Sequence, residues 1–259
     1  MGEALAGGLL RAGWKTSELS LAVRREEHRR EVDAATGISS SLDAVEAASG
    51  RRVVVVAVKP GDVSRLLEQI AGSITADQLV ISLAAGVECA VYEAALGAVP
   101  VVRAMPNTPA QIEAGVTALA GGAFSDDQAM ELASGVLGAV GGTVVLAEPL
   151  LDAVTAVSGT GPAYVFILAE AMVEAAIREG LPWQAAETLV TQTIRGAGML
   201  LAQLEASPAR LRAQVTSPGG TTAAAVHVLE ERGFRALIED AVRAAAQRSR
   251  ELGQRASGE

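Results

Sequence analysis

The sequence predicts an α/β domain built on a parallel sheet, followed by an all-α domain. Three short runs rich in β-branched residues, Arg52–Val58, Leu79–Leu83 and Val101–Met105, are separated by segments of helical length. This alternation is typical of a parallel sheet covered by helices. After residue 147 the strand pattern stops, and long apolar segments follow. We therefore expect two domains, residues 1–147 and residues 148–259.

The composition limits the partners and the cellular location. The net charge of −9 argues against a nucleic acid or an anionic membrane as partner, because phosphate contacts need clustered Lys and Arg. A single cysteine, Cys89, excludes a disulfide framework and a multi-cysteine metal site, so we expect no metal. The N-terminus has no secretory signal pattern, and a cytoplasmic protein is expected.

No segment is expected to span a membrane. The two longest stretches without a charged residue, 153–169 and 213–229, have 17 residues each and are interrupted by Gly and Pro. A membrane-spanning helix needs about 20 apolar residues.

The first residues resemble the second part of a dinucleotide-binding unit. A helix is predicted from Gly2 to near Gly13, and a strand from Leu19 to Val23. In such a unit the helix begins inside a Gly-x-Gly-x-x-Gly loop that follows the first strand. Gly2 then stands for the third glycine. We expect the first strand of the sheet to be missing and the chain as printed to bind the cofactor weakly.

Arg24 and Arg25 follow the predicted strand at the position that reads the adenosine ribose. An Asp or Glu there binds the ribose hydroxyl of NAD, whereas arginine pairs with the 2′-phosphate of NADP. We expect NADP(H) to be preferred and NAD(H) to be possible. The alternative is that both arginines belong to the solvated charge run that ends at Glu31.

Two loops that contain proline follow predicted strands. Ala57-Val58-Lys59-Pro60 ends one strand, and Met105-Pro106-Asn107-Thr108-Pro109 ends another. Open α/β sheets bind their ligands at the carboxyl ends of the strands. Both loops are therefore candidates for cofactor contacts, although a single Lys or Asn after a strand is more often a solvated loop residue.

The second domain is predicted to be helical and dimeric. Long helices are expected from Pro162 to Gly180 and from Pro182 to about Glu205, and both are apolar over most of their circumference. Because a region of little over 100 residues cannot easily bury both alone, we expect dimerisation through them. Three further helices are expected. One starts at Ser207-Pro208, one is capped by Thr221 or Thr222, and the last starts at about Phe234.

The loop before the predicted helix at Thr221 is the most specific stretch. Ser217-Pro218-Gly219-Gly220 removes side chains just ahead of N–H groups that have no partner within the helix. This arrangement predicts a site for an anion of carboxylate size.

Three separated stretches resemble the Δ1-pyrroline-5-carboxylate reductase family. They are Arg103–Ala110, Val157–Tyr164 and Ser217–Glu230, and the resemblance runs from Met1 to about Leu252. It implies a Rossmann-like N-terminal domain and a helical domain that interlocks with a second subunit, in a homodimer or a larger ring. It also implies hydride transfer from NADPH or NADH to a cyclic imino acid, which gives L-proline.

The resemblance also implies roles for individual residues. The nicotinamide half of the cofactor would be contacted by Ala57, Lys59, Pro60, Met105, Asn107 and Thr108. The substrate carboxylate would be bound by Ser217, Gly219, Gly220 and Thr222. The catalytic candidates are Thr222, whose hydroxyl would lie beside the ring nitrogen, and Glu205 near the same atom.

Two alternatives remain open at this stage. One is another imine or β-hydroxyacid reductase of the same architecture. A β-hydroxyacid reductase would need a catalytic Lys in its helical domain, and residues 148–259 contain none. The other is a non-catalytic or impaired dimeric relative that has lost the cofactor loop.

Overall fold

The computed structural model describes residues 1–203 and 207–257, with only the backbone described for 255–257. The chain forms two compact units. Unit 1 contains residues 1–160 and the C-terminal part of helix α12 (Phe234–Ser257) from Arg243 onward. Unit 2 is Gly161–Val242.

Unit 1 contains a five-stranded, mostly parallel sheet. Its strands, in spatial order, are β1 (Val53–Val56), β2 (Leu79–Ser82), β3 (Val101–Met105), β4 (Gly115–Gly121) and β5 (Gly141–Val145). The three predicted runs form β1 to β3 and pair in parallel, which confirms the α/β fold class. β4 runs antiparallel to β3 and was not predicted, because its Ala and Gly residues lack β-branched character.

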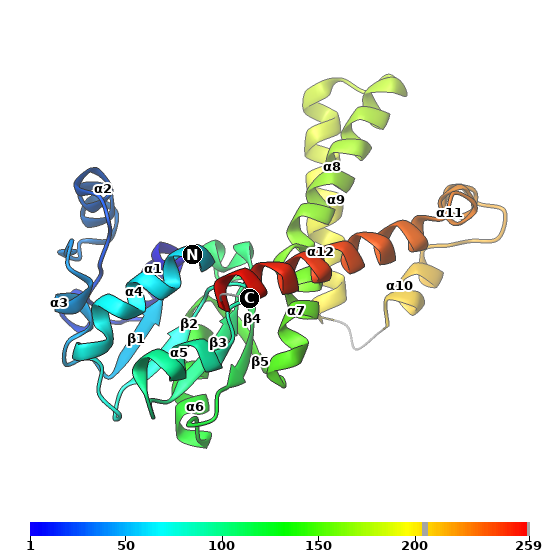
Figure 1. Cartoon of the computed structure of the whole chain (residues 1–259). Coiled ribbons are helices and arrows are strands. Elements are labelled where there is room, and N and C mark those ends of the chain that lie inside the picture. The colour runs from blue at the N-terminus through cyan, green and yellow to red at the C-terminus, as the bar shows by residue number, and fades with distance from the viewer. Residues whose placement is uncertain (204–206, 258–259) are drawn as a thin grey trace. The chain divides into compact units, whose positions relative to one another are not determined.

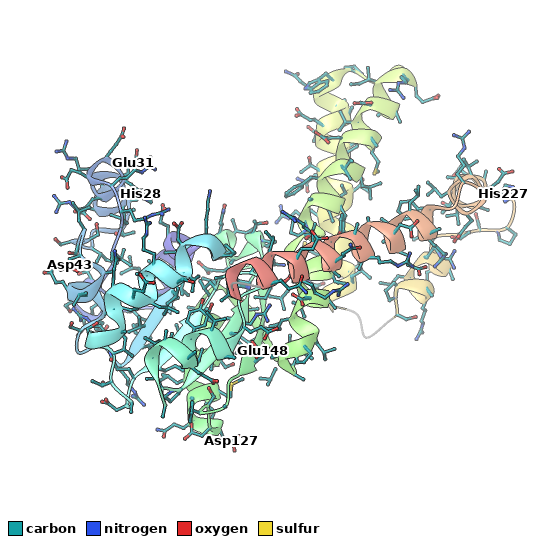
Figure 2. The ribbon with its side chains drawn as sticks, in the orientation of Figure 1. His28, Glu31, Asp43, Asp127, Glu148 and His227 are labelled. Carbon is teal, nitrogen blue, oxygen red and sulfur yellow. The ribbon has the colours of Figure 1, made fainter. Side chains whose placement is uncertain are left out.

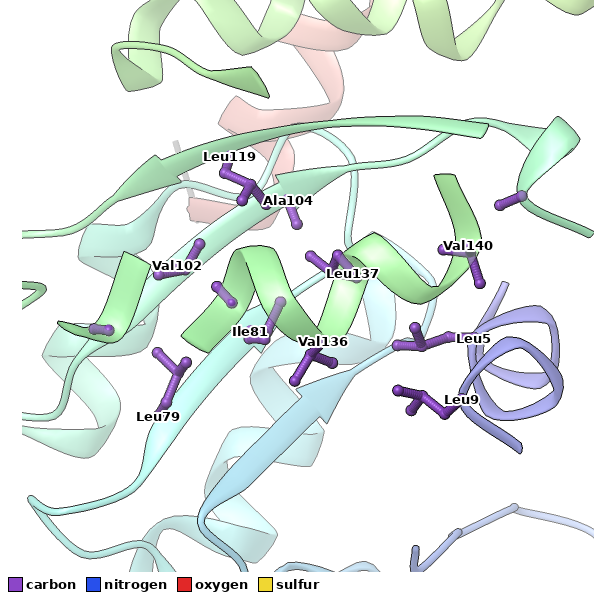
Figure 3. Close-up of a cluster of buried hydrophobic side chains, with 13 residues drawn as sticks. Leu5, Leu9, Leu79, Ile81, Val102, Ala104, Leu119, Val136, Leu137 and Val140 are labelled. Carbon is purple, nitrogen blue, oxygen red and sulfur yellow. The ribbon is translucent and has the colours of Figure 1, made fainter. Parts of the chain in front are cut away.

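Helices cover both faces of this sheet. Unit 1 also contains α1 (Gly2–Arg11), α2 (Glu26–Thr36), α3 (Ala44–Ala48), α4 (Val63–Ile70), α5 (Cys89–Leu96), α6 (Asp127–Leu137) and α7 (Leu151–Val154). Val80 and Val101 pack with α4 and α5, whereas the neighbouring Ile81 and Val102 pack with α1 and α6. Successive residues of a strand thus pack into the cores on opposite faces of the sheet. Figure 3 shows Leu5 of α1 facing Val140 on the α6 side.

The prediction of a strand at Leu19–Val23 is wrong. This segment makes one isolated parallel bridge, Ala22 with Ser41, and joins no strand of the sheet. The Val23 N–H donates to Ser41 O at 2.9 Å, and the Ser41 N–H donates to Leu21 O at 2.8 Å. Its backbone groups therefore find partners in a nearby loop. Among the described residues, β2 is the only strand that pairs with β1.

The C-terminal end of α12 packs closely on unit 1. A Cβ added to Gly253 would lie 2.3 Å from the carbonyl oxygen of Gly86, which has a φ of +79°. One turn earlier, the buried Ser249 hydroxyl donates to Asp152 Oδ1 at 2.6 Å. Two glycines and one hydrogen bond thus fasten this end of the helix.

Unit 2 consists of helices with exposed apolar faces. They are α8 (Gly161–Arg178), α9 (Trp183–Gln203), α10 (Pro208–Gln214), α11 (Thr221–Glu231) and the first part of α12. α8 and α9 lie side by side (Figure 1). No side chain of α8 is buried, and in α9 only Ala186 and Val190 are. Within one chain, the apolar circumference of these helices therefore stays uncovered.

One helical stretch, Glu148–Arg178, could cross a membrane by length and composition alone. The sequence predicts no such stretch, because Gly159-Thr160-Gly161-Pro162 is expected to interrupt it. In the structure, the π-helix Thr155–Gly159 leads directly into α8. Core helices of soluble proteins meet the same criteria.

Gly253→Ala is expected to loosen the docked end of α12, because its Cβ would overlap the backbone of Gly86. Gly135→Ala is the matched control: Gly135 lies inside α6 with nothing within 4 Å of an added Cβ. The control should stabilise the chain by about 0.5–1 kcal/mol. Thermal melting measures both effects, and hydrogen exchange of α12 locates the first. A Gly253→Ala variant with unchanged exchange would show that the approach is not tight.

Candidate functional site

The N-terminus of α1 lies against the loop that follows β1. A Cβ added to Gly2 would be 3.1 Å from the Cβ of Ala57, a tight contact. The first N–H groups of a helix have no partner within it and carry partial positive charge. The structure therefore brings a cluster of backbone donors to the carboxyl end of the parallel strands.

Arg24 lies beside the same loop. Its Nη1 is 2.8 Å from Oδ2 of Asp62, which ends the short 3-10 helix Pro60–Asp62 directly after Lys59. Arg25 immediately precedes α2 and is exposed, as is Lys59. Although Leu19–Val23 is not a strand, the arginine that follows it reaches the loop of β1.

The second predicted loop, after β3, has its shape set by hydrogen bonds. Asn107 Oδ1 accepts the Val116 N–H at 3.0 Å, and its Nδ2 lies 3.5 Å from the Ser158 hydroxyl. Met105 is half-buried, and a Cβ added to Gly159 would be 2.4 Å from its Cε. Thr108 is exposed at the start of the next helical turn.

The π-helix Thr155–Gly159 lies next to this loop. The Thr160 N–H donates to Thr155 O at 2.8 Å, five residues back, and π-helical turns occur frequently at functional sites. Ser158 and Gly159 are not among the site residues predicted from the sequence. The sequence feature that could have identified them is the stretch Val157–Tyr164, one of the three that carry the family resemblance. The structure places both beside Asn107 and Met105.

A buried charge network lies on the face of β3 that is opposite to the core with α1 and α6. Arg103 is 4% exposed, with Nη1 3.5 Å from Glu148 Oε1 and Nη2 3.6 Å from Asp152 Oδ1. Glu148, labelled in Figure 2, also accepts the Cys89 N–H at 2.8 Å. A buried charge is costly unless paired and hydrogen-bonded. The two carboxylates therefore allow one guanidinium to remain inside the domain.

Two neighbouring groups have strongly raised pKa values. Burial, assisted by the charge of Glu148, raises the pKa of the Cys89 thiol to about 12. Burial also raises the pKa of Tyr92 to about 12, although its hydrogen bond with Ser82 at 2.6 Å acts in the opposite direction. Both groups are uncharged near neutral pH. Cys89 therefore acts as a small apolar residue within the core that packs on α4 and α5.

The candidate substrate residues lie in unit 2, in the loop before α11. Gly219 has a φ of +67°, and the Gly220 N–H donates to Ser217 O at 3.1 Å. A Cβ added to Gly220 would lie 2.4 Å from the Ser217 Oγ. The residue that precedes α11 is Gly220, and no side chain caps the helix, so the expected threonine cap is wrong. Thr222, in the first turn, is half-buried.

The remaining candidates are placed as follows. Glu205 lies outside the described residues. Within the described part of the chain, no group of three or more His, Cys, Asp or Glu could hold a metal ion. His28 lies 2.9 Å from Glu3, and His227 is exposed on α11 (Figure 2). The candidate cofactor residues all lie in unit 1, and the described substrate residues all lie in unit 2.

Two family models match the chain, over two separate ranges of residues. Residues 148–252 match pyrroline-5-carboxylate reductase dimerisation, and residues 1–86 match NADP oxidoreductase coenzyme F420-dependent.

Similar proteins carry the same name. A pyrroline-5-carboxylate reductase of Mycobacterium tuberculosis H37Rv is 44% identical, over 97% of this chain and 93% of its own. A Pseudomonas aeruginosa relative of that name is 40% identical, over 98% and 94%. The solved Coxiella burnetii enzyme has a TM-score of 0.90 and 37% identity, over 97% and 94%. A Plasmodium falciparum structure with NADP bound has a TM-score of 0.87 and 27% identity, over 98% and 94%.

The raised pKa of Cys89 predicts a loss of stability at high pH. Above about pH 9 the unfolded chain releases the thiol proton while the folded chain keeps it up to about pH 12, so unfolding becomes more favourable. This group alone contributes up to about 1.4 kcal/mol of lost stability per pH unit in that window. In urea titrations between those pH values, Cys89→Ala should show a shallower decline. An unchanged slope would show that the thiol ionises equally in both states.

Proposed function

The chain belongs to the pyrroline-5-carboxylate reductase family, and we infer that it reduces Δ1-pyrroline-5-carboxylate to L-proline with NADP(H). The observation that carries this conclusion is the 44% identity with a named reductase over nearly the full length of both chains. The test is NADPH oxidation by the purified chain in the presence of the cyclic imine, with proline identified as product. A folded chain without this activity would be the impaired relative.

The residues at the carboxyl edge of the sheet are suited to a dinucleotide. The N-terminus of α1 at Gly2 offers backbone donors for the pyrophosphate, and Arg24 and Arg25 offer charge for a 2′-phosphate. The cofactor, when bound, supplies the hydride. We assign contacts with its nicotinamide half to the two strand-end loops, through Ala57, Lys59, Pro60, Met105, Asn107 and Thr108.

The loop before α11 is suited to the substrate carboxylate. Gly219 and Gly220 have no side chains ahead of α11, and the N–H groups of its first turn have no side-chain cap. The Gly220 N–H itself donates to Ser217 O, which shapes the loop. We assign the carboxylate to Ser217, Gly219, Gly220 and Thr222. The Thr222 hydroxyl would orient the imine nitrogen, with Glu205 as the nearby acid group. Such a site acts mainly by alignment, because a protonated imine is already electrophilic.

We propose a homodimer held through the helical part. α8 and α9 expose large apolar side chains: Phe166 is 64% exposed, Ile167 66% and Trp183 59%. Large exposed apolar side chains that gather on one surface mark an interface. The match of residues 148–252 to a dimerisation family supports this assignment. We also propose that the cofactor part ends at residue 147 and the dimerisation part begins at residue 148. We also propose a cytoplasmic location, because a chain with a single cysteine suits a reducing compartment.

Thr222→Ala is expected to lower kcat at least about tenfold while NADPH affinity is unchanged, because it removes a hydroxyl assigned to the imine. Thr221→Ala is the matched control, since Thr221 is the exposed neighbour in the same turn. Steady-state kinetics with both substrates and NADPH titration measure the effects. Equal losses in the two variants would place the site elsewhere.

Phe166→Glu is expected to convert the dimer to monomer, because a charge on the exposed face of α8 would be buried in the interface. Phe124→Glu changes an exposed phenylalanine of unit 1 in the same way and should leave the dimer intact. Sedimentation velocity distinguishes the two states. A dimeric Phe166→Glu variant would exclude this face of α8.

A further inference from the structure

One carboxylate, that of Asp62, holds two arginines from different parts of the chain. Its Oδ2 is 2.8 Å from Nη1 of Arg24, and its Oδ1 is 3.3 Å from Nη2 of Arg65. Arg24 follows the segment that pairs with Ser41, whereas Arg65 lies in the first turn of α4. Each carboxylate oxygen thus contacts a different guanidinium.

Asp62 does not perform the usual task of an aspartate at its position. It precedes α4, where an Asp side chain normally accepts a backbone N–H of the first turn, yet it makes no such bond. Its carboxylate is directed to the arginines instead. Asp126, which stands at the same position before α6, does cap its helix, accepting the Ala129 N–H at 2.8 Å. Compared with Asp126, Asp62 is unusual because its carboxylate contacts two arginines and does not cap its helix.

Arg24 also differs from other arginines of the charge run around it. Arg29 and Arg30 both pair with Glu26, within their own helix. Arg24 instead pairs across the fold with the residue that ends the loop of β1. This observation favours a positioned side chain over the interpretation of Arg24 as part of a solvated run.

The charges of Arg24, Arg65 and Asp62 do not add up to zero. Two guanidinium groups and one carboxylate leave one net positive charge, and the side chains of Arg24 and Arg65 remain 59% and 63% exposed. Asp62 is only 25% exposed, so the cations face solvent with the acid behind them. A pair of guanidinium groups held in this way matches a phosphate dianion, with several N–H donors in fixed directions.

We propose that Asp62 holds Arg24 and Arg65 as a clamp for the 2′-phosphate of NADP(H), a proposal that rests on the proposed function. Arg65 becomes a second ligand of that phosphate, and Asp62 a positioning residue. Neither residue was singled out in the sequence, because nothing local distinguishes Arg65 from other exposed arginines. Their juxtaposition with Arg24 arises only from the path of the chain between residues 24 and 65.

The test uses two fragments of the cofactor that differ only in the phosphate. Isothermal titration calorimetry of the full chain compares adenosine 2′,5′-bisphosphate with adenosine 5′-monophosphate. Arg65→Ala should weaken binding of the bisphosphate about tenfold and leave the monophosphate unchanged, and Arg65→Lys should lose less. Arg178→Ala, an exposed arginine paired with one glutamate on α8, is the matched control and should change neither.

Asp62→Asn separates positioning from simple charge. The variant makes the patch more positive, so charge alone predicts tighter binding of the bisphosphate. Positioning predicts weaker binding, with partial recovery in Asp62→Glu. In turnover, both Arg65→Ala and Asp62→Asn should raise the KM for NADPH and leave the KM for NADH and kcat unchanged. Circular dichroism melting confirms that the variants are folded.

The outcomes separate this inference from the proposed function. An unchanged ratio of bisphosphate to monophosphate affinity in Arg65→Ala would overturn the clamp while imine reduction by the parent chain stands. Tighter bisphosphate binding by Asp62→Asn would overturn the positioning role. A parent chain that binds neither nucleotide and does not reduce the imine would overturn both the inference and the proposed function.

Discussion

The buried guanidinium of Arg103 is the constraint on which much of unit 1 depends. A charge that is 4% exposed in the middle of a sheet requires nearby carboxylates, and Glu148 and Asp152 supply them. Because both acids follow β5, the chain must return across the sheet after its last strand. Asp152 in turn accepts the hydroxyl of Ser249, so the end of α12 is fastened to the same charge. Removing one partner of such a pair costs about 3–5 kcal/mol.

The same strand connects this network to the candidate cofactor site. β3 places Arg103 on one face and Ala104 in the opposite core, and then ends at Met105, directly before the loop that contains Asn107. The loop is fastened to β4 through Val116 and approached by the π-helix that follows α7. The charge network orients α7, and the π-helix continues from it. The ion pairs of Arg103 and the shape of the loop after β3 are therefore linked through α7 and the π-helix.

The assigned chemistry needs few ionisable groups, and two buried ionisable groups of unit 1 are kept uncharged. Cys89 and Tyr92 stay uncharged well above neutral pH, because burial raises the pKa of both to about 12. The contacts assigned to cofactor and substrate under the proposed function include four ionisable side chains, those of Arg24, Arg25, Lys59 and Glu205. Reduction of a protonated imine depends on orientation more than on proton abstraction, so rigid loops and helix termini are appropriate groups for the task.

Local pattern alone determined the three parallel strands, the loops at their carboxyl ends, the long apolar helices and the glycine-rich loop before α11. Each is visible in a few consecutive residues, because periodicity and turn chemistry act over that range. The antiparallel β4, the isolated bridge at Ala22, the continuous helix through Gly159 and the pairing of Arg24 with Asp62 were decided by tertiary structure. Each depends on which distant segment satisfies a backbone group or a charge, and nothing in the neighbouring residues specifies that partner.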